Sequence, residues 1–246
     1  MEEQKSTVRA VERALEILLC FTAGSDLAMT QIAERTGLHK STVHRMLATL
    51  EEKGFVARDS ASDRYRLGMS IWELSAHLAN TDDPATVCLP EMERLRDTLG
   101  ETVSLYVRDG MERIRIQAVQ SNQAIRRVAP VGARLPLYVG ASSKVLLAFD
   151  ERAITTSDMK GWLASVDREQ LLNQLEQIRA LGYATSIEER EPGAAAVAAP
   201  IFDRSGRLVA ALSVSGPASR LTAAKLEEHA AVIVHSARLL GTMFKA

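Results

Sequence analysis

Residues 29–53 carry apolar positions at helical spacing on both sides of a glycine. Ile32 and Ala33 supply the apolar side of a first short helix, and Gly37 stands where the chain has to leave it. Glycine adopts the left-handed conformation that ends many helices, so the pattern predicts a turn. A second helix is predicted from about Leu38 to Lys53. Its apolar face consists of Val43, Met46, Leu47 and Leu50.

The opposite face of this second helix is basic and rich in hydroxyl groups. No acidic residue occurs between His39 and Leu50. This pattern suits a helix that packs on a core and enters a DNA groove, because a carboxylate there would repel phosphates. We expect Arg45 to read a base edge and Lys40 to contact phosphate. The predicted DNA-contacting set is Lys40, Ser41, Thr42, His44, Arg45 and Arg64.

The flanking segments predict a winged helix-turn-helix. Ahead lies an apolar pattern with helical spacing, made of Val8, Val11, Leu15, Leu18 and Leu19. Behind, residues 55–58 and 64–68 flank a polar tip and predict a hairpin, whose arginines Arg58, Arg64 and Arg66 can reach the DNA backbone or minor groove. We expect Thr30 to cap the first helix of the helix-turn-helix.

Helical patterns at 70–79 and 90–100 lie on either side of Pro84 and predict a helical connector, where we expect subunits to touch.

After Gly100 apolar and polar residues alternate. Hairpin-linked strands with flanking helices predict an antiparallel sheet. Helices are predicted at Ser142–Phe149, between the cap Asp167 and Gly182, and after the cap Thr222. The predicted strands are Thr102–Val107, Arg113–Ala118, Ala124–Val128, Tyr183–Ile187, Ala195–Phe202 and Arg207–Ser215.

Composition narrows the class of protein. The 246 residues are 46% hydrophobic, enough for real cores. No apolar run approaches the ~20 residues of a membrane helix, and no secretory signal is recognisable, so we expect a cytoplasmic protein with no membrane partner. The two cysteines, Cys20 and Cys88, have no metal-ligand spacing, and we expect neither a metal nor another cofactor.

Charge alone does not indicate DNA binding. The net charge is −1, and residues 1–80 contain ten Lys and Arg against eleven Asp and Glu. Attraction to DNA must therefore come from where the basic side chains lie and from dimerisation.

A hydrolase is the enzyme alternative. Residues 140–144 read Gly-Ala-Ser-Ser-Lys, similar to a nucleophile elbow that would present Ser142. The second glycine of that motif is replaced by Lys144, and the available bases, His229 and His235, have no evident acid partner. We therefore expect no catalysis.

The chain resembles the IclR family of bacterial transcription regulators. The resemblance rests on Lys-Ser-Thr-Val-His-Arg-Met-Leu-Ala-Thr-Leu-Glu-Glu-Lys-Gly-Phe-Val, Tyr-Arg-Leu-Gly, Leu-Gly-Glu-Thr-Val, Leu-Pro-Leu-Tyr-Val-Gly-Ala-Ser-Ser-Lys and Ser-Val-Ser-Gly-Pro, in the family's order over nearly the whole chain. It implies an α+β protein with three parts. These are a winged helix-turn-helix DNA-binding domain (1–68), a linker helix (69–84) and a GAF-like effector-binding domain whose antiparallel sheet is flanked by helices (85–246). Members form homodimers or homotetramers.

The resemblance also implies an effector pocket beside the sheet. The matching positions are Arg127, Leu135, Ala141, Ser142, Ser186, Ala196, Ser213 and Ser215. Ser186 stands where small-acid members have an Asp, and Ala196 where they have a Cys. Arg127 falls near a position that is apolar in those members. The lost acid and the added base favour an anion, and the smaller side chains favour a carboxylate of more than two or three carbons.

The expected function is a ligand-responsive repressor of a catabolic operon. It would bind a palindromic double-stranded operator and sense a small organic or aromatic carboxylate. Repression is favoured over activation only because no segment is evident that would contact polymerase. The alternative is a regulator whose closed sheet domain serves only oligomerisation.

Overall fold

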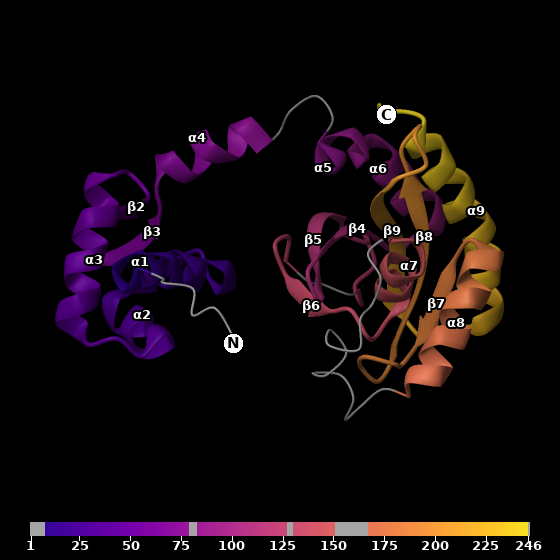
Figure 1. Cartoon of the computed structure of the whole chain (residues 1–246), viewed down its shortest axis with the longest axis horizontal. Helices are drawn as coiled ribbons and strands as arrows, with labels where there is room; N and C mark the ends of the chain where they lie inside the picture. The colour runs from indigo at the N-terminus through magenta and orange to yellow at the C-terminus, as the bar shows by residue number, and fades with distance from the viewer. Residues whose placement is uncertain (1–7, 79–82, 127–129, 151–166, 246) are drawn as a thin grey trace, which may run out of the picture. The chain divides into compact units, whose positions relative to one another are not determined.

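The computed structural model describes residues 8–78, 83–126, 130–150 and 167–245. The chain divides into two compact units, Met1–Asn80 and Thr81–Ala246 (Figure 1). Each unit has its own sheet and hydrophobic core.

The first unit is a winged helix-turn-helix. Its helices are α1 (Arg9–Leu19), the short 3₁₀ helix η1 (Cys20–Ala23), α2 (Met29–Thr36), α3 (Lys40–Glu52) and α4 (Met69–Leu78). Its strands β1 (Asp26–Ala28), β2 (Val56–Arg58) and β3 (Arg64–Leu67) form an antiparallel sheet in the order β1-β3-β2. The hairpin β2–β3 follows α3 directly, as predicted.

The turn between α2 and α3 has the predicted geometry, but the cap of α2 differs. Gly37 ends α2 in the left-handed region with φ of 65°. The helix begins at Met29 with Ala28 as its N-cap residue, two residues earlier than a Thr30 cap requires. Gln31 acts at this end instead, because its Oε1 accepts a hydrogen bond from the Ala28 amide at 2.9 Å.

The core of the first unit holds α3 by its apolar face. Val43 and Leu47 are fully buried and Leu50 nearly so. They pack with Ile17 of α1 and Ile32 of α2 in one cluster. The face of α3 that contains Arg45 therefore points away from the core.

Only part of the apolar pattern at the start of the chain packs against this core, through Leu18. Val8, Val11, Leu15 and Leu19 are each 54–65% exposed, and Ile17 is the buried residue of the helix. These four exposed side chains form a surface that we call the α1 stripe.

The second unit contains a six-stranded antiparallel sheet in the order β6-β5-β4-β9-β8-β7. The strands are β4 (Thr102–Asp109), β5 (Glu112–Val119), β6 (Arg134–Pro136), β7 (Ala184–Ile187), β8 (Ala194–Phe202) and β9 (Leu208–Pro217). The helices are α5 (Pro84–Val87), α6 (Leu89–Leu99), α7 (Ala141–Phe149), α8 (Arg168–Leu181) and α9 (Ala223–Gly241).

One predicted strand was wrong. Residues 124–126 of the predicted strand Ala124–Val128 form no strand, and the rest of that segment lies outside the described residues. The edge beside β5 is taken by β6, in which Leu135 pairs with Arg113.

Both faces of this sheet are covered. On one face, Val197, Ala199 and Leu212 pack with α6 and α9. On the other, Ala198, Ala211 and Tyr106 pack with α7 and α8. Because successive side chains of a strand point to opposite faces, a polar residue inside this sheet is buried whichever way it points.

Candidate functional site

The exposed face of α3 presents the predicted DNA-contacting side chains. Lys40, Ser41, His44 and Arg45 are exposed, and Thr42 is half-buried. Neither Lys40 nor Arg45 forms an ion pair with another described residue, so both cations are available to a ligand.

His39 fixes the start of α3. It is the N-cap residue, and its Nδ1 accepts a hydrogen bond from the Ser41 amide at 3.4 Å. The same Nδ1 lies 2.8 Å from Ser41 Oγ. The His39 carbonyl oxygen accepts hydrogen bonds from the amides of Thr42 and Val43 at 2.8 and 3.1 Å. The first turn of α3 is therefore fixed by His39, and its exposed Lys40 side chain is the group suited to phosphate.

The three arginines of the wing have different surroundings. Arg64 Nε donates to Asp26 Oδ2 at 2.6 Å, and its Nη2 donates to Gln31 Oε1 at 3.2 Å. Arg58 Nε donates to Asp63 Oδ1 at 2.6 Å. Arg66 is exposed and forms no ion pair within the described part of the chain. The predicted contact Arg64 therefore ties β3 to β1 and α2. Arg58 and Arg66 are both exposed, but Arg58 is paired with Asp63 and Arg66 has no ion pair with the described residues.

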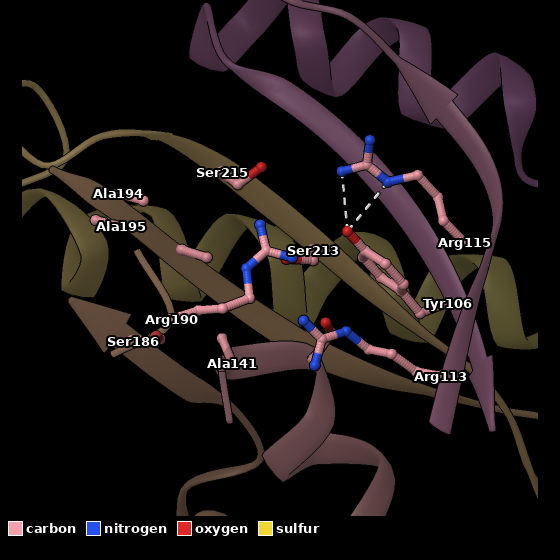
Figure 2. Close-up of a pocket in the computed structure, with 13 residues that line it drawn as sticks. Tyr106, Arg113, Arg115, Ala141, Ser186, Arg190, Ala194, Ala195, Ser213 and Ser215 are labelled. Atoms are coloured by element: carbon pink, nitrogen blue, oxygen red, sulfur yellow. Dashed lines mark hydrogen bonds between the residues drawn. The ribbon is translucent and has the colours of Figure 1, made fainter. Parts of the chain in front are cut away.

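A pocket lies between the sheet and the start of α7 in the second unit (Figure 2). Its volume is about 60 Å³. The walls come from β4, β5, α7, β7, β8, β9 and the loop after β7. The lining residues are Tyr106, Arg113, Arg115, Gly140, Ala141, Ser142, Ser186, Arg190, Ala194, Ala195, Ala196, Ser213 and Ser215.

The pairing of β7, β8 and β9 determines which side chains form the polar floor of this pocket. Ser186 pairs with Ala196, and Ala196 pairs with Ser215. Ser213 lies two residues before Ser215 on β9 and so points to the same face. Three hydroxyl groups thus face one space, one from β7 and two from β9, with Ala196 of β8 between them.

Two arginines of β5 form one wall. Arg113 and Arg115 are only 4% and 3% exposed, and alternation puts both on the face that contains Tyr106. Arg115 Nη2 and Nε donate to Tyr106 Oη at 2.9 and 3.1 Å. Both guanidinium carbons lie over the Tyr106 ring, 5.3 and 5.4 Å from its centroid.

Arg113 also lies against the start of α7. Its Nη1 donates to the carbonyl oxygens of Pro136 and Val139, at 3.1 and 2.8 Å. Gly140 precedes α7 with φ of 95°, and a Cβ at that position would lie 3.3 Å from Arg113 Nη2. The glycine therefore allows the backbone conformation and the close approach of the guanidinium.

Burial and neighbouring cations destabilise the charge of Arg113. Burial is the larger cause and the arginines Arg190 and Arg115 add to it, lowering the pKa of Arg113 to about 10. Nε of Arg113 is buried and has no hydrogen-bond partner among the described residues. A buried, incompletely paired cation of this kind favours an anionic ligand.

The structure brings six of the eight predicted ligand-binding residues to this pocket. Ala141, Ser142, Ser186, Ala196, Ser213 and Ser215 all line it. Leu135 packs instead against the core beneath α7, and Arg127 lies outside the described residues. Whether any of them contacts an effector stays a prediction.

Sequence reasoning missed the three arginines and Tyr106. The available signal was Arg-Ile-Arg-Ile at 113–116, in which the arginines recur every second residue. On a sheet with one solvated face this pattern indicates outward arginines. Here α7 covers their face, so they are buried.

The hydrolase alternative is wrong. Ser142 lies on α7, whereas His229 and His235 lie on α9, on the opposite face of the sheet. The sheet separates the hydroxyl from both imidazoles, so no Ser-His pair forms.

Two further searches cover only the part of the chain described here. No group of three or more His, Cys, Asp or Glu side chains there has a metal-binding arrangement. No helix there is both long and apolar enough to cross a bilayer.

Two family models match the chain. One, described as IclR helix-turn-helix domain, matches residues 10–60. The other, described as Bacterial transcriptional regulator IclR C-terminal, matches residues 77–241.

Curated relatives match over nearly full length. The chain is 31% identical to HTH-type transcriptional regulator KdgR of Escherichia coli (strain K12), covering 97% of this chain and 93% of that protein. It is 32% identical to HTH-type transcriptional regulator BhcR of Paracoccus denitrificans, with 97% and 88% covered. It is also 32% identical to HTH-type transcriptional repressor AllR of Escherichia coli (strain K12), with 95% and 89% covered.

Solved structures agree with the fold. An IclR homologue complexed with 4-hydroxybenzoate from Microbacterium hydrocarbonoxydans matches with a TM-score of 0.82 at 25% identity, covering 95% of this chain and 98% of that one. The IclR of Thermotoga maritima matches with a TM-score of 0.70 at 31% identity, covering 94% and 98%.

Proposed function

Since the chain belongs to the IclR family of DNA-binding transcription regulators, we propose that it represses a catabolic operon and releases its operator when a small organic or aromatic carboxylate binds the sheet domain. The observation that carries the effector half of this proposal is the pocket with the buried, incompletely paired Arg113. The family relative crystallised with 4-hydroxybenzoate supports a carboxylate as the ligand class.

We infer that α3 enters the major groove of a palindromic operator. Arg45 would read a base edge, and Lys40, Ser41, Thr42 and His44 would contact phosphates or neighbouring bases. Arg66 would contact the backbone or minor groove beside them. Arg64 then acts through its bonds to Asp26 and Gln31, which orient the wing.

A palindromic operator requires two copies of the chain, and the α1 stripe supports a homodimer, or a tetramer built from two dimers. Four apolar side chains on α1 and its N-cap residue Val8 are more than half exposed, which is costly in water, and a second copy of the stripe would cover them. Two recognition helices would then be held at a fixed spacing.

Leu15→Glu is expected to weaken self-association at least ~10-fold, because it places a charge inside the covered apolar surface. Sedimentation velocity over a concentration series measures this effect. Leu181→Glu, which changes a similarly exposed leucine at the end of α8, is the matched control. An unchanged dissociation constant for Leu15→Glu would remove the α1 stripe from the dimer interface.

The test uses the intergenic DNA that separates the gene encoding this chain from the adjacent gene. Fluorescence anisotropy measures binding of the purified protein to that duplex, with and without a panel of carboxylic acids. We expect at least one acid to weaken binding ~10-fold or more. Operator binding that no acid changes would favour the alternative, in which the sheet domain serves only oligomerisation.

A further inference from the structure

Of the three cations that line the pocket, one has donors without a partner among the described residues. Arg190 is paired with an acid, and Arg115 donates to Tyr106. Arg113 uses only its Nη1, on two carbonyl oxygens. Its Nε and Nη2 form no hydrogen bond with the described residues, and these two donors make up the edge of a guanidinium that binds a carboxylate as a fork. The pocket therefore offers one carboxylate site, at Arg113.

The remaining polar lining consists largely of serine hydroxyl groups. They belong to Ser142, Ser186, Ser213 and Ser215, and none of them forms a hydrogen bond with another described residue. No Asp or Glu is among the lining residues. A serine hydroxyl both donates and accepts, and so does a hydroxyl group on a ligand. The lining thus suits a ligand that has hydroxyl groups as well as its carboxylate.

The positions of these serines leave room for a carbon chain between them. Ser186 and Ser215 flank Ala196 in the paired strands, so about two strand spacings of ~4.8 Å separate them, with only a methyl group between. Ser213 lies about 7 Å further along β9 (Figure 2). A short chain above Ala196 can therefore place hydroxyl groups toward serines on both sides.

The apolar lining is too small to favour an aromatic ring. Apart from Tyr106 it consists of methyl groups and a glycine, from Gly140, Ala141, Ala194, Ala195 and Ala196. The Tyr106 ring already has the guanidinium carbons of Arg113 and Arg115 at 5.3 and 5.4 Å from its centroid. Since aromatic ligands bind best against large apolar and aromatic side chains, an aliphatic chain with hydroxyl groups matches this lining better.

A buried hydroxyl group beside the floor supports the same ligand class. Ser104 is 1% exposed, and its Oγ has no hydrogen-bond partner among the described residues. It pairs with Ser213 across β4 and β9, so the two side chains are neighbours on the face that holds the pocket. Ser213 can accept from Ser104 while it donates to a ligand oxygen, because a hydroxyl oxygen has two lone pairs.

We propose that the effector of this pocket is an aliphatic hydroxycarboxylate. Its carboxylate binds the Nε–Nη2 edge of Arg113, and hydroxyl groups on its chain bind the serines of β7 and β9. This inference rests on the proposed function, because it narrows the chemical class of ligand that the same site takes.

Isothermal titration calorimetry on the full chain at constant ionic strength tests the proposal. D-glycerate, L-glycerate and propionate form the first matched set, because they share a carbon chain and differ by two hydroxyl groups. D-threonate and L-threonate with butyrate extend the series by one carbon. We expect one hydroxy acid to bind at least ~10-fold more tightly than the unsubstituted acid of the same length, as about two additional hydrogen bonds require.

Variants assign the hydroxyl contacts to this floor. Ser213→Ala and Ser186→Ala are each expected to lower the ratio of hydroxy-acid to unsubstituted-acid affinity about 3- to 10-fold. Neither removes a hydrogen bond within the described part of the chain, so both variants should fold. Arg113→Met is expected to lower the affinity for both classes of acid at least ~10-fold, because it removes the partner of the carboxylate. Ser219→Ala, at an exposed serine after β9, is the matched control.

Three results would overturn the inference. Unsubstituted acids that bind as tightly as the hydroxy acids, or no binding by any hydroxy acid, would remove the hydroxyl groups from the ligand. Benzoate or 4-hydroxybenzoate that binds more tightly than every aliphatic hydroxy acid would make the ligand aromatic. An unchanged affinity ratio in both serine variants would move the contacts away from this floor. Each leaves the proposed function intact as long as some carboxylate weakens operator binding, and the proposed function itself fails if none does.

Discussion

Arg45→Ala is expected to lower operator affinity by roughly 5- to 150-fold per half-site and to relax the base preference at one position. A bidentate arginine contact discriminates against the wrong base by about 1–3 kcal/mol. Arg45 is exposed on α3, opposite the buried Val43 and Leu47. It forms no ion pair with the described residues, so no carboxylate among them competes with a base for its guanidinium. Anisotropy titrations against the operator and against single-base variants measure both effects.

Lys40→Ala separates base reading from phosphate binding. It is expected to weaken binding to specific and non-specific duplexes alike and to reduce the dependence on salt by about one phosphate contact per chain. Arg238→Ala, which removes an exposed arginine on α9, is the control. If Arg45→Ala weakened operator and random DNA equally, α3 would contact the backbone without reading bases.

Leu47→Ala is expected to destabilise the first unit by about 2–5 kcal/mol, because it opens a cavity where a fully buried leucine joins α3 to α1 and α2. Amide hydrogen exchange of α3 reads this unit separately from the second one. Amide exchange in α3 should accelerate by the factor that corresponds to this loss in unfolding free energy, while exchange in α9 stays constant.

Leu67→Ala on β3 is the control for Leu47→Ala, because Leu67 is 41% exposed. We expect a much smaller change in α3 exchange from this variant. Equal effects of the two substitutions would mean that Leu47 does not anchor the recognition helix.

The helix-turn-helix was predictable because its signals are local. Gly37 has the left-handed conformation that its position implies, and the apolar face of α3 contacts the core of one small unit. The cap of α2 was missed because helical spacing does not fix the residue at which a helix begins. The helix starts two residues earlier than a Thr30 cap requires, and the Gln31 side chain accepts from the amide of the N-cap residue Ala28.

The α1 stripe shows where helical spacing is insufficient. Val11 and Leu15 repeat at the right interval, but the repeat says only that the side chains share a face. The core of this unit contains Ile17, Phe21 and Leu27, and it does not include Val11 or Leu15. What covers such a face depends on contacts beyond the chain's own fold.

The pocket was predictable only in part, for a similar reason. The serines of β9 and the start of α7 were placed by local pattern together with the family resemblance. Arg113, Arg115 and Arg190 come from segments 75 residues apart, and their convergence depends on sheet order and on α7 covering their face. Strand alternation assigns residues to a face without saying what lies above it.

The central claim is that occupancy of the pocket controls the affinity of α3 for DNA. The most direct measurement is the operator dissociation constant of the full chain, by anisotropy, with and without saturating carboxylates, in wild type and in Arg113→Met. The account predicts that at least one carboxylate raises that constant ~10-fold or more in wild type, and that Arg113→Met loses the shift at the same ligand concentration. A wild-type constant that no carboxylate changes, or an equal shift in Arg113→Met, would contradict it.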